Sequence, residues 1–113
     1  FGCGGERDAS KRPIMGKVAE DFSDFIILTS DNPRNENETK IIEDIKAGIL
    51  NHKKIKIETN RKQAIYQTLI ELKDCPESVL LIAGKGHESY QEIKGKQYEF
   101  NDKDMIRSVM STI

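Results

Sequence analysis

The apolar run from Val79 to Ala83, followed by Gly84, Lys85 and Gly86, constrains the fold of this chain more than any other feature. A short run that is apolar at every position is typical of a parallel strand buried on both faces. The two glycines allow the backbone to turn sharply after the strand and to approach a ligand closely. Because ligands in open α/β sheets lie at the carboxyl ends of the strands, we expect a binding site at residues 84–88.

Helices and strands are predicted to alternate along the rest of the chain. Apolar residues at helical spacing indicate helices over residues 13–22, 38–50 and 61–73, and a last helix that Asp102 caps. Further strands are expected at residues 25–29 and 55–58, and residues 89–100 show the pattern of a β-hairpin. This order predicts an α/β fold: a Rossmann-like, mostly parallel sheet with flanking helices and a C-terminal β-hairpin.

Two details of these helices can be checked directly. The first helix is expected to bury its apolar face, which consists of Ile14, Met15, Val18, Ala19 and Phe22. Asn60 is expected to cap the third helix, because its side chain can accept a hydrogen bond from the first helical turn.

Size and charge exclude several classes of protein. With 113 residues, 33% of them charged and a net charge of −1, the chain is predicted to be one globular domain. The balanced charge argues against a nucleic-acid partner. No apolar run approaches the roughly 20 residues of a membrane span, and no signal peptide is visible. We therefore expect a cytoplasmic monomer without a membrane partner, in which Cys3 and Cys75 are reduced thiols.

Polar residues follow three of the predicted strand ends, in the loops at residues 2–11, 30–35 and 84–88. In a parallel sheet these loops meet at one edge, so their side chains are expected to converge. Those side chains are Arg7, Asp8, Asp31, Asn32, Arg34, Lys85, His87 and Glu88. Neither glycine-rich loop completes a dinucleotide fingerprint or a Walker A motif, so a phosphate cradle for ATP would lie elsewhere.

Four motifs, in this order, resemble the C-terminal domain of the Mur ligases over essentially the whole chain. They read FGCGGERD at residues 1–8, KRPIMG at 11–16, DNPR at 31–34 and AGKGHE at 83–88, the last followed by Tyr90 and Gln91. Within the family, the resemblance is to the ligases that add the third amino acid of the peptidoglycan stem peptide.

The resemblance implies that residues 1–113 are a single amino-acid-binding domain excised from a longer, three-domain enzyme. Such an enzyme would use ATP and Mg²⁺, held mainly by the missing central domain. It would activate UDP-N-acetylmuramoyl-L-alanyl-D-glutamate as an acyl phosphate, which the amine of meso-diaminopimelate attacks. The isolated domain is expected to be inactive, with no catalytic residue and no metal ligand of its own.

Matched by position, the resemblance implies particular roles for residues of this chain. The residues expected to hold the incoming amino acid are Arg7, Asp31, Asn32, Pro33, Arg34, Gly84 and Glu88. Arg34 offers a planar fork to the distal carboxylate that distinguishes diaminopimelate from lysine, and Glu88 can accept from an ammonium. Asp8, Lys11 and Arg12 are expected to face the phosphates of ATP.

Two alternatives remain open. One is a lysine-adding or folylpolyglutamate-type ligase of the same superfamily, which would not need an arginine at position 34. The other is a non-catalytic, flavodoxin-like binding module, which would bind its ligand without partner domains. The preference for a distal carboxylate separates the first alternative from the diaminopimelate ligase.

Overall fold

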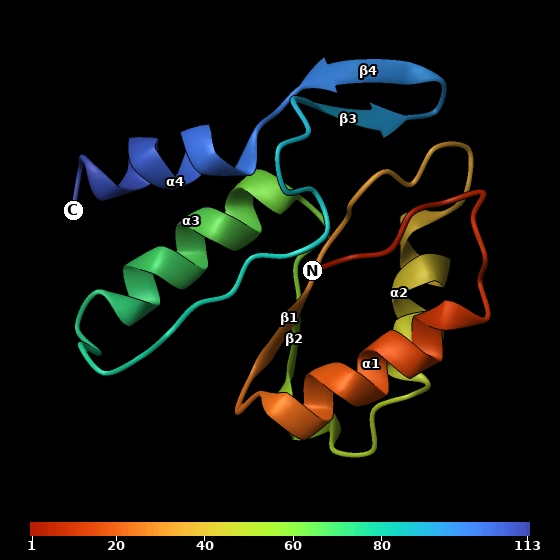
Figure 1. Ribbon diagram of the computed structural model, residues 1–113, viewed down its shortest axis with the longest axis horizontal. Coiled ribbons are helices and arrows are strands. Elements are labelled where there is room, and N and C mark those ends of the chain that lie inside the picture. Colours follow the sequence, from red (N-terminus) through yellow and green to blue (C-terminus); the bar gives the residue numbers. More distant parts are fainter.

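Helices and strands alternate in the computed structural model, which describes all of residues 1–113. In chain order the elements are α1 (Lys11–Phe22), β1 (Ile26–Leu28), α2 (Glu38–Lys46), η1 (His52–Lys54), β2 (Ile55–Ile57), α3 (Arg61–Leu72), β3 (Tyr90–Ile93), β4 (Lys96–Glu99) and α4 (Asp102–Met110). In Figure 1, α1 and α2 lie to one side of the β1–β2 pair, and α3 and α4 pack together on the other. The predicted α/β class is confirmed. None of the helices has the length and apolar character that a membrane span requires.

The parallel part of the sheet is smaller than the sequence predicts. Strands β1 and β2 pair in parallel, with Ile26 opposite Ile55. On the other edge of β1, the N–H of Phe1 donates to the Ile27 carbonyl at 3.1 Å, and the Phe1 carbonyl accepts from the Thr29 N–H at 3.0 Å. The β3–β4 hairpin is antiparallel, as predicted, and forms a separate sheet.

The expected central strand at residues 79–83 does not form, so that prediction is wrong. The run pairs with no strand, and Val79 and Leu81 are 93% and 81% exposed. Phe1, and not this run, occupies the free edge of β1. Because a buried strand needs a neighbour and a covered face, the run lies at the surface, where Leu80, Ile82 and Ala83 are half-buried.

Helix α2 and strand β1 form the core. The buried cluster consists of Ile26, Leu28, Ile41, Ile42, Ile45 and Ile49. Each isoleucine or leucine removed from water in this way contributes about 1.5–3 kcal/mol. The apolar stripe predicted for α2 is therefore confirmed, although the helix ends at Lys46 and Leu50 is exposed.

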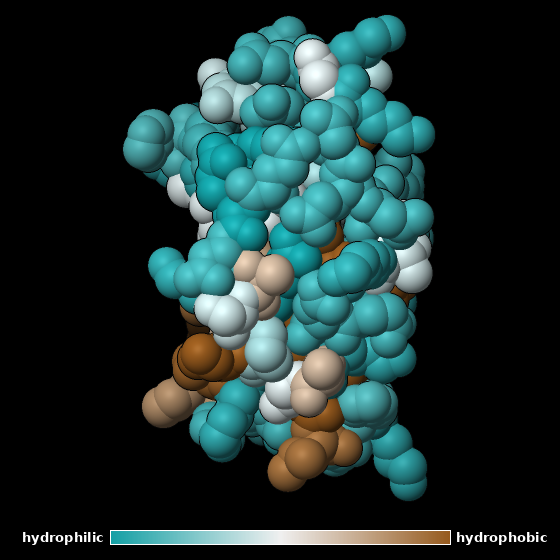
Figure 2. Space-filling model, turned by 90° about the vertical axis from the view of Figure 1, so that its right-hand side faces the viewer, coloured by the Kyte–Doolittle hydropathy of each residue, from teal (hydrophilic) through white to brown (hydrophobic).

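Helix α1 does not bury the face that its sequence suggests. Four of the five apolar residues of that face are exposed, and only Ala19 packs partly against the core. The exposed ones are Ile14, Met15, Val18 and Phe22. Figure 2 shows hydrophobic side chains gathered at the lower end of the molecule, where α1 lies in Figure 1.

Glycine explains the orientation of α1. The helix buries Gly16, at which a Cβ atom would collide with the carbonyl oxygen of Ile45 in α2. Gly48 plays the reciprocal part, because a Cβ there would collide with the Pro13 carbonyl. The two helices therefore touch backbone to backbone, a contact that only glycine permits.

Asparagine side chains cap the N-termini of α2, α3 and α4. Asn37 and Asn60 accept hydrogen bonds from the first turns of α2 and α3. Helix α4 is capped by Asn101, however, and not by Asp102 as expected. The Asp102 carboxylate points inward instead, because it pairs with a buried arginine.

That buried arginine is Arg61, at the start of α3. Its Nε and Nη2 atoms each donate to a carboxylate oxygen of Asp102 at 2.8 Å. The same guanidinium donates to the Ser30 carbonyl at 3.1 Å and to the Ala83 carbonyl at 3.2 Å. One side chain therefore links α3, α4 and the segments that follow β1 and the 79–83 run.

Replacing this arginine tests its importance for stability. We expect Arg61→Met to lower the free energy of unfolding by about 3–5 kcal/mol, since Asp102 would remain buried without its partner. Urea unfolding followed by circular dichroism measures this difference. Arg107→Met, which changes an exposed arginine of α4, is the matched control and should change the free energy by less than about 0.5 kcal/mol. Equal effects of the two substitutions would contradict the linking role of Arg61.

Candidate functional site

Residues 1–5 lie backbone to backbone along the segment that follows β1. A Cβ atom on Gly2 would collide with the Thr29 carbonyl, and one on Gly5 with the Pro33 carbonyl. The Gly5 N–H donates to the Asn32 carbonyl at 2.7 Å. The glycines thus serve close approach between two chain segments, and this brings the first predicted loop against the second.

Lys85 joins the third loop to the second. Its side chain is fully buried, and its Nζ donates to Asn32 Oδ1 at 2.8 Å and to the Tyr90 carbonyl at 2.9 Å. Two carboxylates lie near the ammonium, Asp31 Oδ1 at 3.2 Å and Glu88 Oε1 at 4.0 Å. Asp31 Oδ1 is buried and makes no hydrogen bond, so its contact with Lys85 is an ion pair only.

Asn32 connects Lys85 to Glu88. Its Oδ1 accepts from Lys85 Nζ and from the Glu92 N–H at 2.9 Å. Its Nδ2 donates to Glu88 Oε1 at 3.1 Å. Asn32 is buried, whereas Glu88 is half-buried, and the second carboxylate oxygen of Glu88 makes no hydrogen bond. Glu88 therefore has one oxygen fixed and one available.

The β-hairpin holds Arg34 in a left-handed conformation, with φ at 55°. Its N–H donates to the Glu92 carbonyl at 3.0 Å, and its carbonyl accepts from the Lys94 N–H at 2.7 Å. A left-handed arginine is unfavourable by about 1–2 kcal/mol, so these two bonds keep the backbone in a conformation it would otherwise avoid. Such strain is frequent at binding sites.

The guanidinium of Arg34 is only partly used. Nη1 donates to the Gly5 carbonyl at 2.9 Å and to the Asn32 carbonyl at 3.3 Å. Nε lies 3.4 Å from Glu92 Oε2 as an ion pair, and neither Nε nor Nη2 makes a hydrogen bond. The outer edge of the fork therefore has donors without hydrogen bonds, and a ligand carboxylate could use them by sharing or displacing the Glu92 ion pair.

Arg7 lies beside Arg34. A Cβ atom on Gly4 would be 3.0 Å from Arg34 Nη1 and 3.4 Å from Arg7 Cγ, so both side chains border this glycine. Arg7 is exposed, and its only hydrogen bond is from Nη1 to the Glu6 carbonyl at 3.1 Å. The guanidinium of Arg34 and the side-chain stem of Arg7 thus approach the same glycine.

Asp8, Lys11 and Arg12, the residues expected to face ATP phosphates, lie in three different environments. Arg12 is only 2% exposed and donates to Glu36, to Asp44 at 2.9 Å and to the Gly4 carbonyl at 3.1 Å. Its guanidinium is thus engaged inside the domain, and a contact with a phosphate would require these ion pairs to open. Asp8 bonds to Ser10, which lowers the pKa of its carboxyl, and Lys11 is exposed.

No ATP or Mg²⁺ site is assembled from these residues. Only Lys11 of the expected phosphate contacts is both cationic and free. No group of three or more His, Cys, Asp or Glu side chains is arranged to hold a metal ion. Residues 1–113 therefore do not fit either group by themselves.

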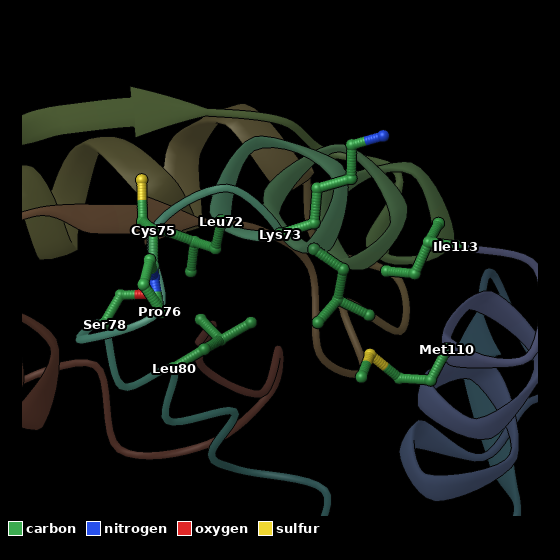
Figure 3. A pocket seen from close by; sticks show the side chains of 9 residues that line it. Leu72, Lys73, Cys75, Pro76, Ser78, Leu80, Met110 and Ile113 are labelled. Carbon is green, nitrogen blue, oxygen red and sulfur yellow. The ribbon is translucent and has the colours of Figure 1, made fainter.

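Two cavities differ in place and character. A polar cavity of about 220 Å³ borders Arg34 and is lined by Pro33, Glu36, Asn37, Glu38, Thr39, Thr59, Ile93 and Lys94 besides. An apolar cavity of about 450 Å³ lies between the C-terminal parts of α3 and α4 and the segment from Cys75 to Leu80, with Leu72, Leu80 and Met110 around it (Figure 3). The polar cavity adjoins the converging loops, and the apolar one does not.

Sequence reasoning named most of the converging side chains but missed how they are joined. The sequence places Lys85 among the converging residues, near enough to Glu88 to pair with it, but it does not indicate the contacts with the Tyr90 carbonyl or of Asn32 with Glu92. The signal for Lys85 was its position between two glycines, both of which have positive φ. His87 is exposed, and its side chain makes no hydrogen bond or ion pair.

Comparison with known proteins identifies close relatives of the chain. A family model described as "Mur ligase, glutamate ligase domain" matches residues 1–86. A UDP-N-acetylmuramoyl-L-alanyl-D-glutamate--2,6-diaminopimelate ligase of Aquifex aeolicus is 51% identical over 97% of this chain. The ligase of the same name from Cytophaga hutchinsonii is 47% identical over 99% of the chain.

A solved structure agrees with the sequence comparison. A structure of a UDP-N-acetylmuramoyl-L-alanyl-D-glutamate--2,6-diaminopimelate ligase superposes with a TM-score of 0.84 and 39% identity, over 99% of this chain. The chain covers 23% of that structure and 22% of the Aquifex aeolicus protein. It thus spans about a fifth of the length of the curated relatives that it matches.

The network around Arg12 makes stability depend on pH. Hydrogen bonds from Arg12 and from the Glu6 N–H lower the pKa of Glu36, and hydrogen bonds from Lys40 and Arg12 lower the pKa of Asp44. Carboxyls with a lowered pKa stabilise the fold above their unfolded pKa values, near 4, and this stabilisation is lost as the pH falls through the folded values. We expect the free energy of unfolding to fall steeply between about pH 5 and pH 3.

Variants separate this contribution from general acid denaturation. Glu36→Gln combined with Asp44→Asn should flatten the pH dependence in urea titrations performed at a series of pH values. Glu77→Gln removes an exposed carboxylate that makes no hydrogen bond or ion pair, and it should leave the slope unchanged. An unchanged slope in the double variant would show that the two carboxyls are not coupled to folding.

Proposed function

The chain belongs to the Mur ligase family, and on that premise we propose that it is the amino-acid-binding domain of a longer ligase. The proposed enzyme adds meso-diaminopimelate to UDP-N-acetylmuramoyl-L-alanyl-D-glutamate in peptidoglycan synthesis. The names of relatives that are 47–51% identical support this substrate. ATP, which the family uses, and Mg²⁺ would be held by the rest of the longer protein, because residues 1–113 do not fit them.

The observation that carries the proposal is that Nε and Nη2 of Arg34 make no hydrogen bond. The buried edge of this guanidinium is fixed by the Gly5 and Asn32 carbonyls, and the backbone is clamped by the hairpin. A guanidinium fixed on one edge presents Nε and Nη2 in a geometry that matches a carboxylate. Glu92 lies 3.4 Å from Nε, so an incoming carboxylate would share or displace that ion pair.

The ligand's other charged groups also have counterparts. Meso-diaminopimelate carries two carboxylates, and a second arginine, the exposed Arg7, borders Gly4 through its Cγ as Arg34 does through its Nη1. The available oxygen of Glu88 can accept from an ammonium, as can the carbonyl of the exposed Gly84. This pattern of two cations and one anion favours a diamino diacid over a simple diamine or a neutral ligand.

Substitution of Arg34 in the full-length ligase tests the proposal. We expect Arg34→Ala to lower kcat/KM for meso-diaminopimelate by about 10²–10³-fold, because a charge-assisted carboxylate contact is lost. The preference for meso-diaminopimelate over L-lysine should shrink by a similar factor, since L-lysine lacks the distal carboxylate. Steady-state release of phosphate at varied amino acid concentration measures both quantities. Arg107→Ala, an exposed arginine of α4, is the control and should have wild-type kinetics.

The other outcomes identify the alternatives. A wild-type enzyme that uses L-lysine as well as meso-diaminopimelate would be a lysine-adding ligase, contrary to the proposal. Unchanged discrimination in Arg34→Ala would mean that Arg34 is not the selecting residue. Tight ligand binding to residues 1–113 alone, with no ligase activity in the full-length protein, would favour the flavodoxin-like binding module.

A further inference from the structure

We propose that Lys85 is a positioning residue that orients Asn32 and Glu88 for the incoming amino acid. The inference rests on the function proposed above, because it assigns a role within the same site. Lys85 cannot contact a ligand itself, since its side chain has no exposure to solvent. Its effect on binding must therefore act through the side chains that surround its ammonium.

Three oxygens surround the ammonium, two as hydrogen-bond acceptors and one as an ion-pair partner. An –NH₃⁺ group has three N–H donors and no acceptor. Lys85 Nζ meets Asn32 Oδ1 at 2.8 Å, the Tyr90 carbonyl at 2.9 Å and Asp31 Oδ1 at 3.2 Å. A buried charge of this kind adds little to stability compared with an apolar side chain of similar size. Its presence beside the proposed binding residues points to an orienting role.

The direction of the Asn32 amide depends on Lys85. Two donors, Lys85 Nζ and the Glu92 N–H, converge on Oδ1 and require an acceptor there. The amide nitrogen must then face Glu88, to which it donates at 3.1 Å. With the amide reversed, an NH₂ group would face two donors and an oxygen would face the Glu88 carboxylate, both of which are unfavourable.

Glu88 is thereby held with one oxygen fixed and one available. The fixed oxygen lies 4.0 Å from Lys85 Nζ, so the lysine also balances part of the charge of Glu88 and Asp31. One cation between two carboxylates leaves a net negative charge, which favours an ammonium ligand. Without the cation, the two carboxylates would repel each other and Glu88 would lose its fixed position.

The backbone supports this arrangement. Gly84 and Gly86 have φ values of 109° and 55°, and the Glu88 N–H donates to the Lys85 carbonyl at 2.9 Å. Left-handed conformations on both sides of one residue let the chain reverse within a few residues, which glycine allows. The turn directs Lys85 inward while the neighbouring Gly84 and Glu88 face the site.

The test compares Lys85→Met with Lys62→Met in the full-length ligase. Methionine keeps an unbranched side chain as far as Cε and removes the charged ammonium, and Lys62 is an exposed lysine of α3 without a hydrogen bond or ion pair. We expect Lys85→Met to raise KM for meso-diaminopimelate by about 10–100-fold, the loss expected for hydrogen bonds to charged groups. KM for ATP and for the UDP-linked dipeptide should stay within about twofold of wild type, and Lys62→Met should match wild type throughout.

A purely structural lysine gives a different result. Lys85→Met would then lower the active fraction, and thus kcat, with KM for the amino acid unchanged; that outcome overturns the proposal. If Lys85→Met does not fold, KM for the amino acid is measured with Asn32→Asp instead. This variant keeps the acceptor for Lys85 but turns an oxygen toward Glu88, so the proposal expects the same rise in KM, and a wild-type KM refutes it.

The same measurements keep this proposal separate from the proposed function. The wild-type enzyme shows whether meso-diaminopimelate is the substrate, independently of any variant. If another amino acid is the substrate, the ratio of KM values between Lys85→Met and wild type is measured with that amino acid. A rise confined to that KM still supports the positioning role, and no rise contradicts it.

Discussion

The buried ion pair between Arg61 and Asp102 fixes the two segments from which the candidate site is built. Its guanidinium also holds the Ser30 carbonyl, just before Asp31, and the Ala83 carbonyl, just before Gly84. The loops at residues 31–35 and 84–88 therefore start from points tied to a single side chain. Because a guanidinium has five donors in one plane, it can satisfy a carboxylate and two carbonyls at once, which no lysine could do.

The four arginines near the loops differ in how many donors are already satisfied. Arg61 and Arg12 are buried, and each makes four hydrogen bonds to carboxylates and carbonyls, so they hold the fold together. Arg34 makes hydrogen bonds through Nη1 only, and its Nε and Nη2 donors make none. Arg7 is exposed and makes one hydrogen bond. Binding capacity thus follows from unsatisfied donors and not from the number of positive charges, and Lys85 belongs with the buried, engaged group.

The sequence predicts those parts of the structure that depend on local patterns. The stripe of α2, the cap at Asn60 and the hairpin around Gly95 each arise from neighbours in the chain, and the structure confirms them. Two predictions are wrong: the buried strand at residues 79–83 and the buried apolar face of α1. Both rest on hydrophobicity alone, which does not reveal which other segment would cover an apolar surface. The carboxylate partners of Arg12 and Arg61 are also not predicted from the sequence, since they lie 24 to 41 residues away in the chain. The family resemblance identifies the loop residues of the candidate site. It does not reveal the contacts that Lys85 makes with them.

A crystal structure of the full-length ligase with meso-diaminopimelate would test the central claim most directly. The claim is that Arg34 and Glu88 divide the recognition of one ligand between a carboxylate and an ammonium. The predicted result is a ligand carboxylate within hydrogen-bond distance of Nε and Nη2 of Arg34, and an amine within hydrogen-bond distance of Glu88. A ligand bound elsewhere, with Arg34 still paired only to Glu92, would contradict it.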